Sequence, residues 1–437
     1  MSKVRLLIMV LCASLWVEGS YAQNYYVLTL EQMFALADEN SKTLKVEDAA
    51  VAEAEQAVKV AKNGHLPDIG ISLSASYLGN GYLMDRDFSN GQSIKMPHFG
   101  NNFAVEATQL IYGGGAVTNG VAMAKLKEEM AGVNREAARS RIHFMLTGFY
   151  LDLYKLQNIL KVYDRNIELA KVVIKDTKAR NAAGVALQND VTRYELQLKN
   201  LELARRRVEN AVEILNYDLV TMLGLPADTQ IVLDSTLTER TIPTESMDYW
   251  QQLAQTNAHA IKQTALAVKM GERGEMLARS ERLPKIALVA ANHFDGPITI
   301  EVPTINKNFN YWYVGVGVSF NISSLYKANK SIKQAQYSTA LSRRRYDDVV
   351  EQTAMAVQAD YTKYLEAYEE VATLEKSVQL ATENYGVIEN RYRNDIALVT
   401  DMLDASNQLL DAELQLANAR INVIFNYYKL KNTSGNL

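Results

Sequence analysis

One stretch of this sequence occurs twice, and the repetition limits the folds open to the chain. The residues NDIALVTDMLDASNQLLD at 394–411 correspond to GVALQNDVTRYELQLKN at 184–200, and this aligns Asp401 with Asp190, 211 residues apart. The same separation pairs side chains over roughly fifty positions, so the stretch belongs to a long internal repeat. A repeated sequence builds one structural unit twice. We therefore expect a first repeat at 23–235 and a second at 236–437.

The positions of proline show where long helices can form. None of the seven prolines lies between Pro97 and Pro226, and none follows Pro303. Proline breaks helix interiors, and both proline-free stretches are rich in Ala, Leu, Glu, Lys, Gln and Arg, which favour helices. In the first repeat we predict a helix at 29–62, strands at 67–79 and 101–111, a long helix ending near 178, a turn at 179–189 and a helix at 190–223. In the second we predict a helix at 247–281, strands at 284–294 and 311–320, a long helix at 326–391, a turn at 392–399 and a helix at 400–431.

The predicted strands have one apolar and one polar face. Ile69, Ile71 and Leu73 alternate with glycine and serine, which is the period of two of a half-buried strand. Strands of about ten residues with aromatic side chains near their ends, such as Tyr77 and Trp312, are typical of a transmembrane β-barrel with aromatic girdles. Four strands cannot close around a pore, and strand edges cannot face lipid. We therefore expect a mainly α-helical chain whose four transmembrane strands join those of two further copies in one twelve-stranded barrel.

The N-terminus has the pattern of a secretory signal peptide. Lys3 and Arg5 form its charged end and residues 6–17 its apolar core, and a small-residue cleavage site follows, so we expect residues 1–22 to be removed. The alternative is a membrane anchor helix, for which the apolar core is short. Cys12, the only cysteine, lies in this core. A lipid-modified cysteine is a second alternative, but the apolar run continues past Cys12. Once the signal peptide is removed, the mature chain has no cysteine and can form no disulfide.

Composition and charge argue against several classes of function. The formal net charge is −4, whereas a nucleic-acid-binding protein carries a basic face. The five histidines show no metal-ligand spacing. The glycines at 113–115 are not followed by the Gly-Lys-Ser/Thr of a phosphate-binding loop. No catalytic combination of side chains stands out, so we expect no enzyme, no metal site, no cofactor and no nucleic-acid partner.

Several motifs resemble those of one known family, the TolC-like outer-membrane efflux channels. They are GVALQNDV at 184–191, DIALVTDMLDA at 395–405, LANARIN at 416–422, and the Leu-Pro pairs at 66–67 and 283–284. The resemblance covers essentially the whole mature chain. It implies a homotrimer in the outer membrane of a Gram-negative bacterium, with a twelve-stranded β-barrel continued into the periplasm by a long α-helical barrel. It also implies a periplasmic adaptor protein and an inner-membrane pump as partners, and outer-membrane lipid around the barrel.

The resemblance gives the acidic residues near 401 a second meaning. Asp401 and Asp404 are three apart at a helix start and so share a face. The simple interpretation is helix capping, because carboxylates are favoured in a first turn. The family places aspartates here as rings at the narrow periplasmic mouth, and such a ring would favour cations. In the closed state of the family's channels, an aspartate at the position of Asp190 is linked to a tyrosine at the position of Tyr392. The arginine that the family has in this network is replaced here by Ala397.

The two turns are the expected contact surface for the adaptor, and an ordinary solvated turn is the alternative. Small side chains exposed at a hairpin end and the resemblance both favour adaptor contact. The residues concerned are Gly184, Val185, Ala186, Leu187, Asp395, Ile396, Ala397 and Leu398.

We expect a passive outer-membrane exit duct that carries small toxic molecules or drugs and is gated at its periplasmic tip. Protein secretion of type I and metal efflux stay open within the channel class. A periplasmic coiled-coil scaffold without a pore is the alternative outside it, and it leaves the alternating strands unexplained.

Overall fold

The computed structural model describes residues 25–234, 245–302, 304–394 and 396–437, so the predicted signal peptide at 1–22 lies outside the described residues. The chain divides into two compact units. The hairpin unit contains residues up to 44 together with 138–254 and 355–437, and the sheet unit contains 45–137 and 255–354. Two long helices, α4 (Ala116–Ala182) and α8 (Ser324–Arg393), contribute residues to both units.

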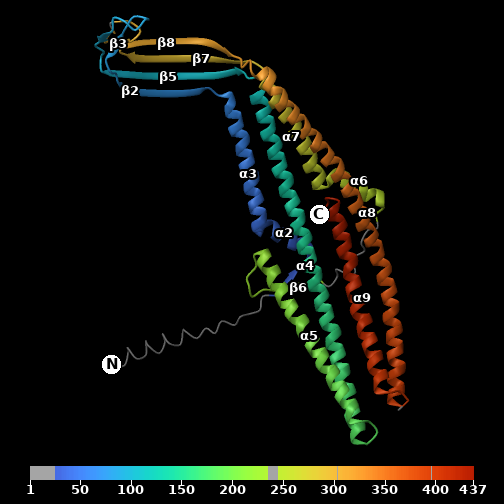
Figure 1. Ribbon diagram of the computed structural model, residues 1–437. Helices are drawn as coiled ribbons and strands as arrows, with labels where there is room; N and C mark the ends of the chain where they lie inside the picture. The colour runs from blue at the N-terminus through green and yellow to red at the C-terminus, as the bar shows by residue number, and fades with distance from the viewer. Residues whose placement is uncertain (1–24, 235–244, 303, 395) are drawn as a thin grey trace, which may run out of the picture. The chain divides into compact units, whose positions relative to one another are not determined.

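The sheet unit is built on a four-stranded antiparallel sheet in the order β2-β5-β7-β8 (Figure 1). These strands are β2 (Asp68–Tyr77), β5 (Phe99–Tyr112), β7 (Lys285–Gly296) and β8 (Phe309–Ser319). They overlap the four expected strand ranges. A small hairpin of β3 (Gly81–Leu83) and β4 (Gln92–Ile94) lies between the predicted strands 67–79 and 101–111. The helices α3 (Lys42–Lys62) and α7 (His259–Ser280) lead into the sheet.

The register of the sheet gathers apolar side chains on one face. Ile71 pairs with Val105, which in turn pairs with Asn292, so alternate residues of neighbouring strands stand on the same side. On this side the valines and isoleucines of β2 and β8 are exposed. The edges β2 and β8 have no further strand beside them among the described residues, so the sheet of a single chain is open.

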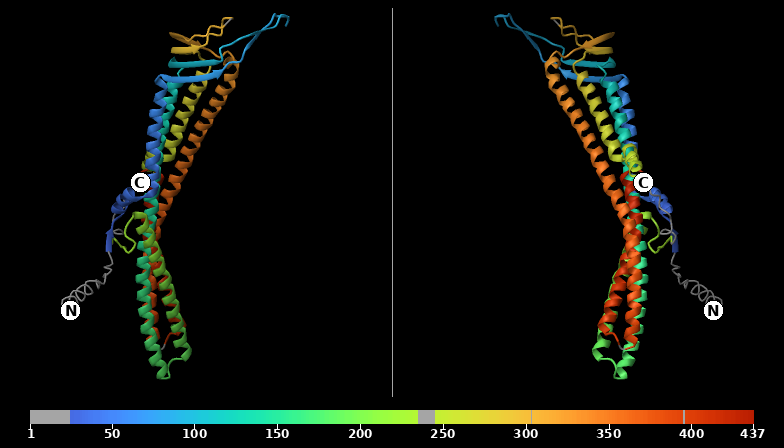
Figure 2. Two further views of the ribbon diagram at one scale, coloured as in Figure 1. Left: turned by 90° about the vertical axis from the view of Figure 1, so that its left-hand side faces the viewer. Right: turned by 90° about the vertical axis from the view of Figure 1, so that its right-hand side faces the viewer.

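The hairpin unit consists mainly of two antiparallel helical hairpins. One joins α4 to α5 (Gln188–Leu223), and the other joins α8 to α9 (Val399–Thr433). Figures 1 and 2 show the two hairpins side by side, with both turns at the same end of the unit. Two short helices, α2 (Leu30–Asn40) and α6 (Met247–Asn257), and a parallel pair of strands, β1 (Tyr25–Leu28) and β6 (Gln230–Leu233), complete it.

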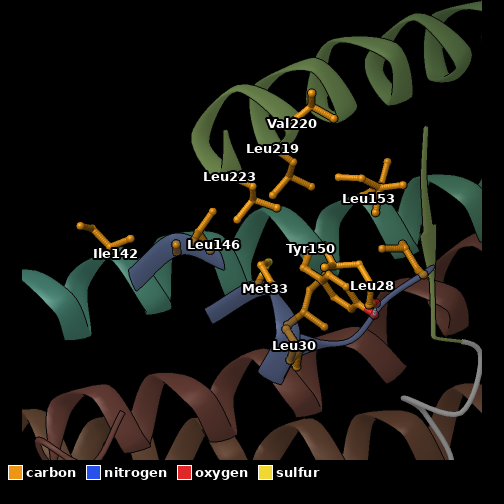
Figure 3. Packing of buried hydrophobic residues seen from close by; sticks show 14 of the residues in the cluster. Leu28, Leu30, Met33, Ile142, Leu146, Tyr150, Leu153, Leu219, Val220 and Leu223 are labelled. Atoms are coloured by element: carbon orange, nitrogen blue, oxygen red, sulfur yellow. Dashed lines mark hydrogen bonds between the residues drawn. The ribbon is translucent and has the colours of Figure 1, made fainter. Parts of the chain in front are cut away.

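The core of the hairpin unit lies where α2, α4 and α5 meet the β1–β6 pair. Leucines from all three helices point toward one another there, around Tyr150 (Figure 3). The Tyr150 hydroxyl donates to the Leu28 carbonyl at 2.8 Å and accepts from the Asp234 amide at 3.0 Å. A buried tyrosine needs such partners. Tyr150 thus ties the start of the described chain to the segment that follows α5.

Two predicted helices are interrupted in the structure. The predicted helix 29–62 begins with a Thr29–Gln32 capping box but breaks at Ser41. The Ser41 hydroxyl accepts from the Leu44 amide at 3.4 Å, and the Asn40 side chain donates to the Leu223 carbonyl at 3.0 Å. A serine that caps a new helix competes with continuation of the old one. The predicted helix 247–281 likewise breaks at Ala258, whose φ of −55° and ψ of 122° are not helical.

Among the described helices, none has an apolar stretch long enough to cross a membrane.

Candidate functional site

Both helical hairpins end in the same kind of turn. In the first, the Val185 amide donates to the Arg180 carbonyl at 2.9 Å. In the second, the Ile396 amide donates to the Arg391 carbonyl at 2.8 Å. A bond that reaches back five residues satisfies a carbonyl at a helix end while the chain turns away. The two bonds join equivalent residues of the expected repeat, since both partners are 211 positions apart.

The helices that follow the two turns begin in the same way as well. The Asp190 carboxylate accepts from the Leu187 amide at 3.1 Å, and the Asp401 carboxylate accepts from the Leu398 amide at 2.9 Å. Each aspartate therefore satisfies one of the free amides at a helix N-terminus, where negative charge is also favoured by the helix dipole. Capping, the simple interpretation of Asp401, is thus present in the structure.

Tyr392 makes a different hydrogen bond from the one expected. Its buried hydroxyl lies 3.0 Å from the Thr177 hydroxyl. Thr177 already donates to the Val173 carbonyl at 2.8 Å, and a threonine has one hydroxyl proton, so Tyr392 is the donor. Within the described part of the chain, the expected bond between Asp190 and Tyr392 is not formed, because the Asp190 carboxylate is turned to the Leu187 amide.

Arg180 also contacts Tyr392 from the other hairpin. Its guanidinium lies 5.1 Å from the centre of the Tyr392 ring, within the range of a cation–π interaction. Its Nη1 also donates to the Arg393 carbonyl at 3.4 Å. The sequence suggests that this network lacks an arginine because Ala397 stands at the family's position. In the structure a cation reaches Tyr392 nevertheless, and it comes from the other hairpin.

Apolar side chains from all four helices surround this link. Ile174, Tyr194, Tyr392, Val399 and Met402 are buried together. The Tyr194 hydroxyl is buried and has no hydrogen-bond partner among the described residues, and burial raises the pKa of its phenol above the usual range. A buried polar group without a partner costs free energy, so Tyr194 and Tyr392 are two tyrosines of one cluster with opposite hydrogen-bonding states.

The remaining acidic residue, Asp404, lies one turn further along α9 and is exposed. Its carboxylate accepts from the Gln408 side chain at 2.8 Å. Asp401 is exposed as well. In a single chain these two carboxylates share one face of α9, and neither is paired with a cation among the described residues.

The turns themselves present aliphatic side chains to solvent. Four of them are between 62% and 70% exposed, and they are Val185, Leu187, Ile396 and Leu398. Ala186 and Ala397 are half-buried beneath them. Gly184 has φ 79° in the left-handed region that favours glycine, and the corresponding Asp395 lies outside the described residues.

The site is therefore a contact between two hairpins beneath an exposed apolar tip. Sequence reasoning found Tyr392 but missed Thr177 and Arg180. These two are three residues apart on α4 and hence on one face. This spacing is the only sequence signal that could have predicted that Thr177 and Arg180 act together. Among the described residues, no group of histidine, cysteine, aspartate and glutamate is arranged to hold a metal ion.

Comparison with known proteins gives one consistent family. The sequence model of the family "Outer membrane efflux protein" matches residues 34–225 and 250–436. The chain is similar to the outer membrane efflux protein BepC of Brucella suis, with 23% identity over 94% of this chain and 86% of that protein. It is also similar to the outer membrane protein TolC of Escherichia coli, with 22% identity over 93% of this chain and 82% of that protein.

Solved structures show the same fold. The outer membrane protein VceC of Vibrio cholerae superposes with a TM-score of 0.78 at 15% identity, over 93% of this chain and 96% of that chain. The CmeC outer membrane channel of Campylobacter jejuni superposes with a TM-score of 0.74 at 14% identity, over 93% of this chain and 85% of that chain.

Proposed function

Because the chain belongs to the outer membrane efflux protein family, we propose that it is the passive exit duct of a tripartite export system. The protein is located in the outer membrane of a Gram-negative bacterium, and its family is one of channels rather than enzymes. The observation that carries the proposal is the open four-stranded sheet with an exposed apolar face. Such a face is stable in lipid once its edges are paired.

Three copies of the chain would close the barrel. The β8 edge of one copy pairs with the β2 edge of the next, which gives twelve strands and leaves no edge open to lipid. The apolar face, with Leu73 and Val316 near its middle, then contacts outer-membrane lipid. The other face, which carries serine, glycine and asparagine, lines the pore. The two repeats of each chain supply two strands apiece.

The hairpin unit would form the periplasmic part of the duct. Its exposed apolar tips, with Leu187 and Leu398 the most exposed, are the surface we assign to a periplasmic adaptor protein. Exposed aliphatic side chains in a contiguous patch mark contact sites. The energy for export comes from an inner-membrane pump, since a passive duct supplies none.

The contact between the hairpins would hold the periplasmic mouth closed. Tyr392 bonds to Thr177 and lies under Arg180, so parting the hairpins breaks both interactions. Asp401 and Asp404 from three copies would place six carboxylates around the mouth, which would favour cations and bind multivalent ones. In this proposal the closing contact is the Thr177–Tyr392 bond, which connects α4 to α8, and Asp190 serves to cap α5.

Small toxic molecules or drugs are the proposed cargo, with type I protein secretion and metal efflux as the other possibilities within the channel class. A coiled-coil scaffold without a pore would leave the apolar face of the sheet uncovered in water, at a cost of about 25 cal/mol for each Å².

Two measurements on the purified full-length protein test the proposal. We expect a trimer by light scattering after extraction in detergent, and discrete cation-selective conductance in planar bilayers. Recovery of a monodisperse protein from the soluble periplasm without detergent, with no conductance after addition to bilayers, would contradict the channel and support the scaffold.

A further inference from the structure

The polar face of the sheet carries an unexpected group of rings. Most residues on this face are small or polar, as Ser72, Ser74 and Asn102 illustrate. Near the loop that joins β7 to β8, however, four ring-bearing side chains stand on it together. They are His293, Phe309, Tyr311 and Tyr313, and we call them the ring cluster.

The strand register places these rings on one side. His293 lies directly opposite Tyr311, and Tyr313 and Phe309 follow at alternate positions of β8 on either side of Tyr311. The opposite side of the same strand carries Trp312. The rings are therefore on the face that lines the pore in the proposed trimer.

The rings stack in parallel rather than packing edge to face. The His293 imidazole lies 5.1 Å from the Tyr311 ring at an interplanar angle of 16°, and 6.1 Å from the Tyr313 ring at 13°. Phe309 continues the stack at 5.3 Å from Tyr311 and 25°. Parallel rings leave space at the ends and sides of the stack that a further flat ring can occupy.

The ring cluster is also open to solvent. Phe309, Tyr311 and Tyr313 are between 38% and 53% exposed, whereas His293 is held between the tyrosines with 16% of its side chain exposed. Aromatic surface exposed on a face of small polar residues is what a binding site for an apolar, flat ligand requires.

On the strands themselves the charges near the rings are negative, while Lys307 lies in the adjoining β7–β8 loop. The Glu106 carboxylate lies 3.9 Å from His293 Nε2 and is largely exposed, and the Asp295 carboxylate on the same face accepts from Asn102. Within the four strands the only lysine or arginine is Lys285, at the opposite end of β7. It lies roughly 26 Å from His293 at about 3.3 Å per residue. The rings and the carboxylates together favour a positive ligand.

We propose that the ring cluster is a binding site for planar aromatic cations that pass through the outer end of the pore. This inference rests on the proposed function, because only a pore brings solutes along the polar face. The flat ring of the cation stacks on the exposed faces of Tyr311, Tyr313 and Phe309, and its charge is attracted by the aromatic faces and by Glu106. Molecules of this class would then dwell at the outer end during export.

Block of the channel current by ethidium, a planar aromatic cation, tests this site. The full-length trimer is reconstituted in planar bilayers, and ethidium is added on the side of the β7–β8 loop. We expect concentration-dependent block of the wild-type channel. The double variant Tyr311→Leu/Tyr313→Leu should raise the half-blocking concentration about tenfold. Tyr311→Phe/Tyr313→Phe keeps the rings and should retain the block.

Two controls fix the interpretation. Trp312→Leu removes a ring from the opposite face of the same strand and should leave the block unchanged, and Mg²⁺, a strongly hydrated cation that does not stack on rings, should affect the leucine variant and the wild type alike. Glu106→Gln should weaken ethidium block about threefold, as expected for one exposed charge, and it tests the site independently if the leucine variant fails to assemble.

The outcomes separate the two proposals. The ring cluster would be overturned as a binding site, and the duct left intact, by either of two results. One is a conducting wild-type channel that ethidium does not block, and the other is block of the leucine and glutamine variants that is as strong as block of the wild type. A trimer with no conductance at all would refute the duct, and the ring cluster as a site in transit with it.

Discussion

The sheet unit and the hairpin unit use apolar side chains in opposite ways. In the hairpin unit, Leu146 and Leu223 are fully buried around Tyr150. In the sheet unit, Leu73 and Val316 are exposed on a face that nothing in the described chain covers. The difference indicates that the two units face different surroundings, water and lipid. The hairpin unit folds against water in the ordinary way, whereas the sheet unit has a face that suits lipid.

The largest expected effect is in the buried core. Leu146→Ala removes a fully buried side chain, and we expect it to destabilise the hairpin unit by about 2–5 kcal/mol, because the lost contacts leave a cavity. Leu146→Met keeps the volume and should cost less than about 1.5 kcal/mol. Denaturant unfolding followed by helical circular dichroism measures both, and equal effects of the two changes would contradict a tightly packed core.

The second prediction concerns the exposed face of the sheet. Leu73→Arg puts a charge on the face that we assign to lipid, and it should make membrane insertion less favourable by about 2–4 kcal/mol. Ser72→Arg places the same charge on the other face of the same strand. It should insert normally and change only the conductance. Membrane fractionation compares them, and normal insertion of both variants would show that the apolar face does not contact lipid.

The third prediction uses the two tyrosines of the hairpin contact. Tyr392→Phe removes the bond to Thr177 and should destabilise the contact by about 0.5–1.5 kcal/mol. The open probability of the channel should rise accordingly. Tyr194→Phe removes a buried hydroxyl for which the described part of the chain offers no partner, so the stability of the hairpin unit should be unchanged or higher. If the two variants gated alike in single-channel recordings, the Thr177–Tyr392 bond would have no part in closing the mouth.

The smallest effect separates the two aspartates of α9. Asp401→Asn weakens a helix cap and should cost about 0.3–1 kcal/mol, whereas Asp404→Asn lies outside the cap and should cost less. Both remove one charge per chain from the proposed mouth. Block by trivalent cations in planar bilayers should therefore weaken similarly in both variants, and unchanged block in both would contradict the carboxylate ring.

The sequence predicted those parts of the fold that depend on local pattern. Alternation along Ile69, Ile71 and Leu73 located a strand and its apolar face, and the proline-free stretches located the long helices. The break at Ser41 could not be predicted, because it depends on the contact of Asn40 with the carbonyl of Leu223, which is distant in sequence. Pairing of β1 with β6 was missed for the same reason.

The candidate site was predictable to a similar degree. The repeat and the acidic first turns identified Asp190 and Asp401, and both cap helices in equivalent ways. The bond of Tyr392 to Thr177 was not predicted, because the choice between Asp190 and Thr177 depends on how the helices are rotated against each other. Hydrogen-bond patterns within one turn can be read from sequence, whereas contacts between helices need the packed structure.

Disulfide cross-linking between copies tests the central claim most directly. The sequence has only Cys12, within the predicted signal peptide, so new cysteines report without interference. Pairs combining one β2 position (Ile71, Ser72 or Leu73) with one β8 position (Val314, Gly315 or Val316) scan the possible registers, since a disulfide requires Cα atoms about 4.4–6.8 Å apart. The duct predicts that at least one pair in native outer membranes yields a covalent trimer on non-reducing gels. Monomers alone for every pair, from a protein that is correctly inserted, would contradict a barrel shared by three chains.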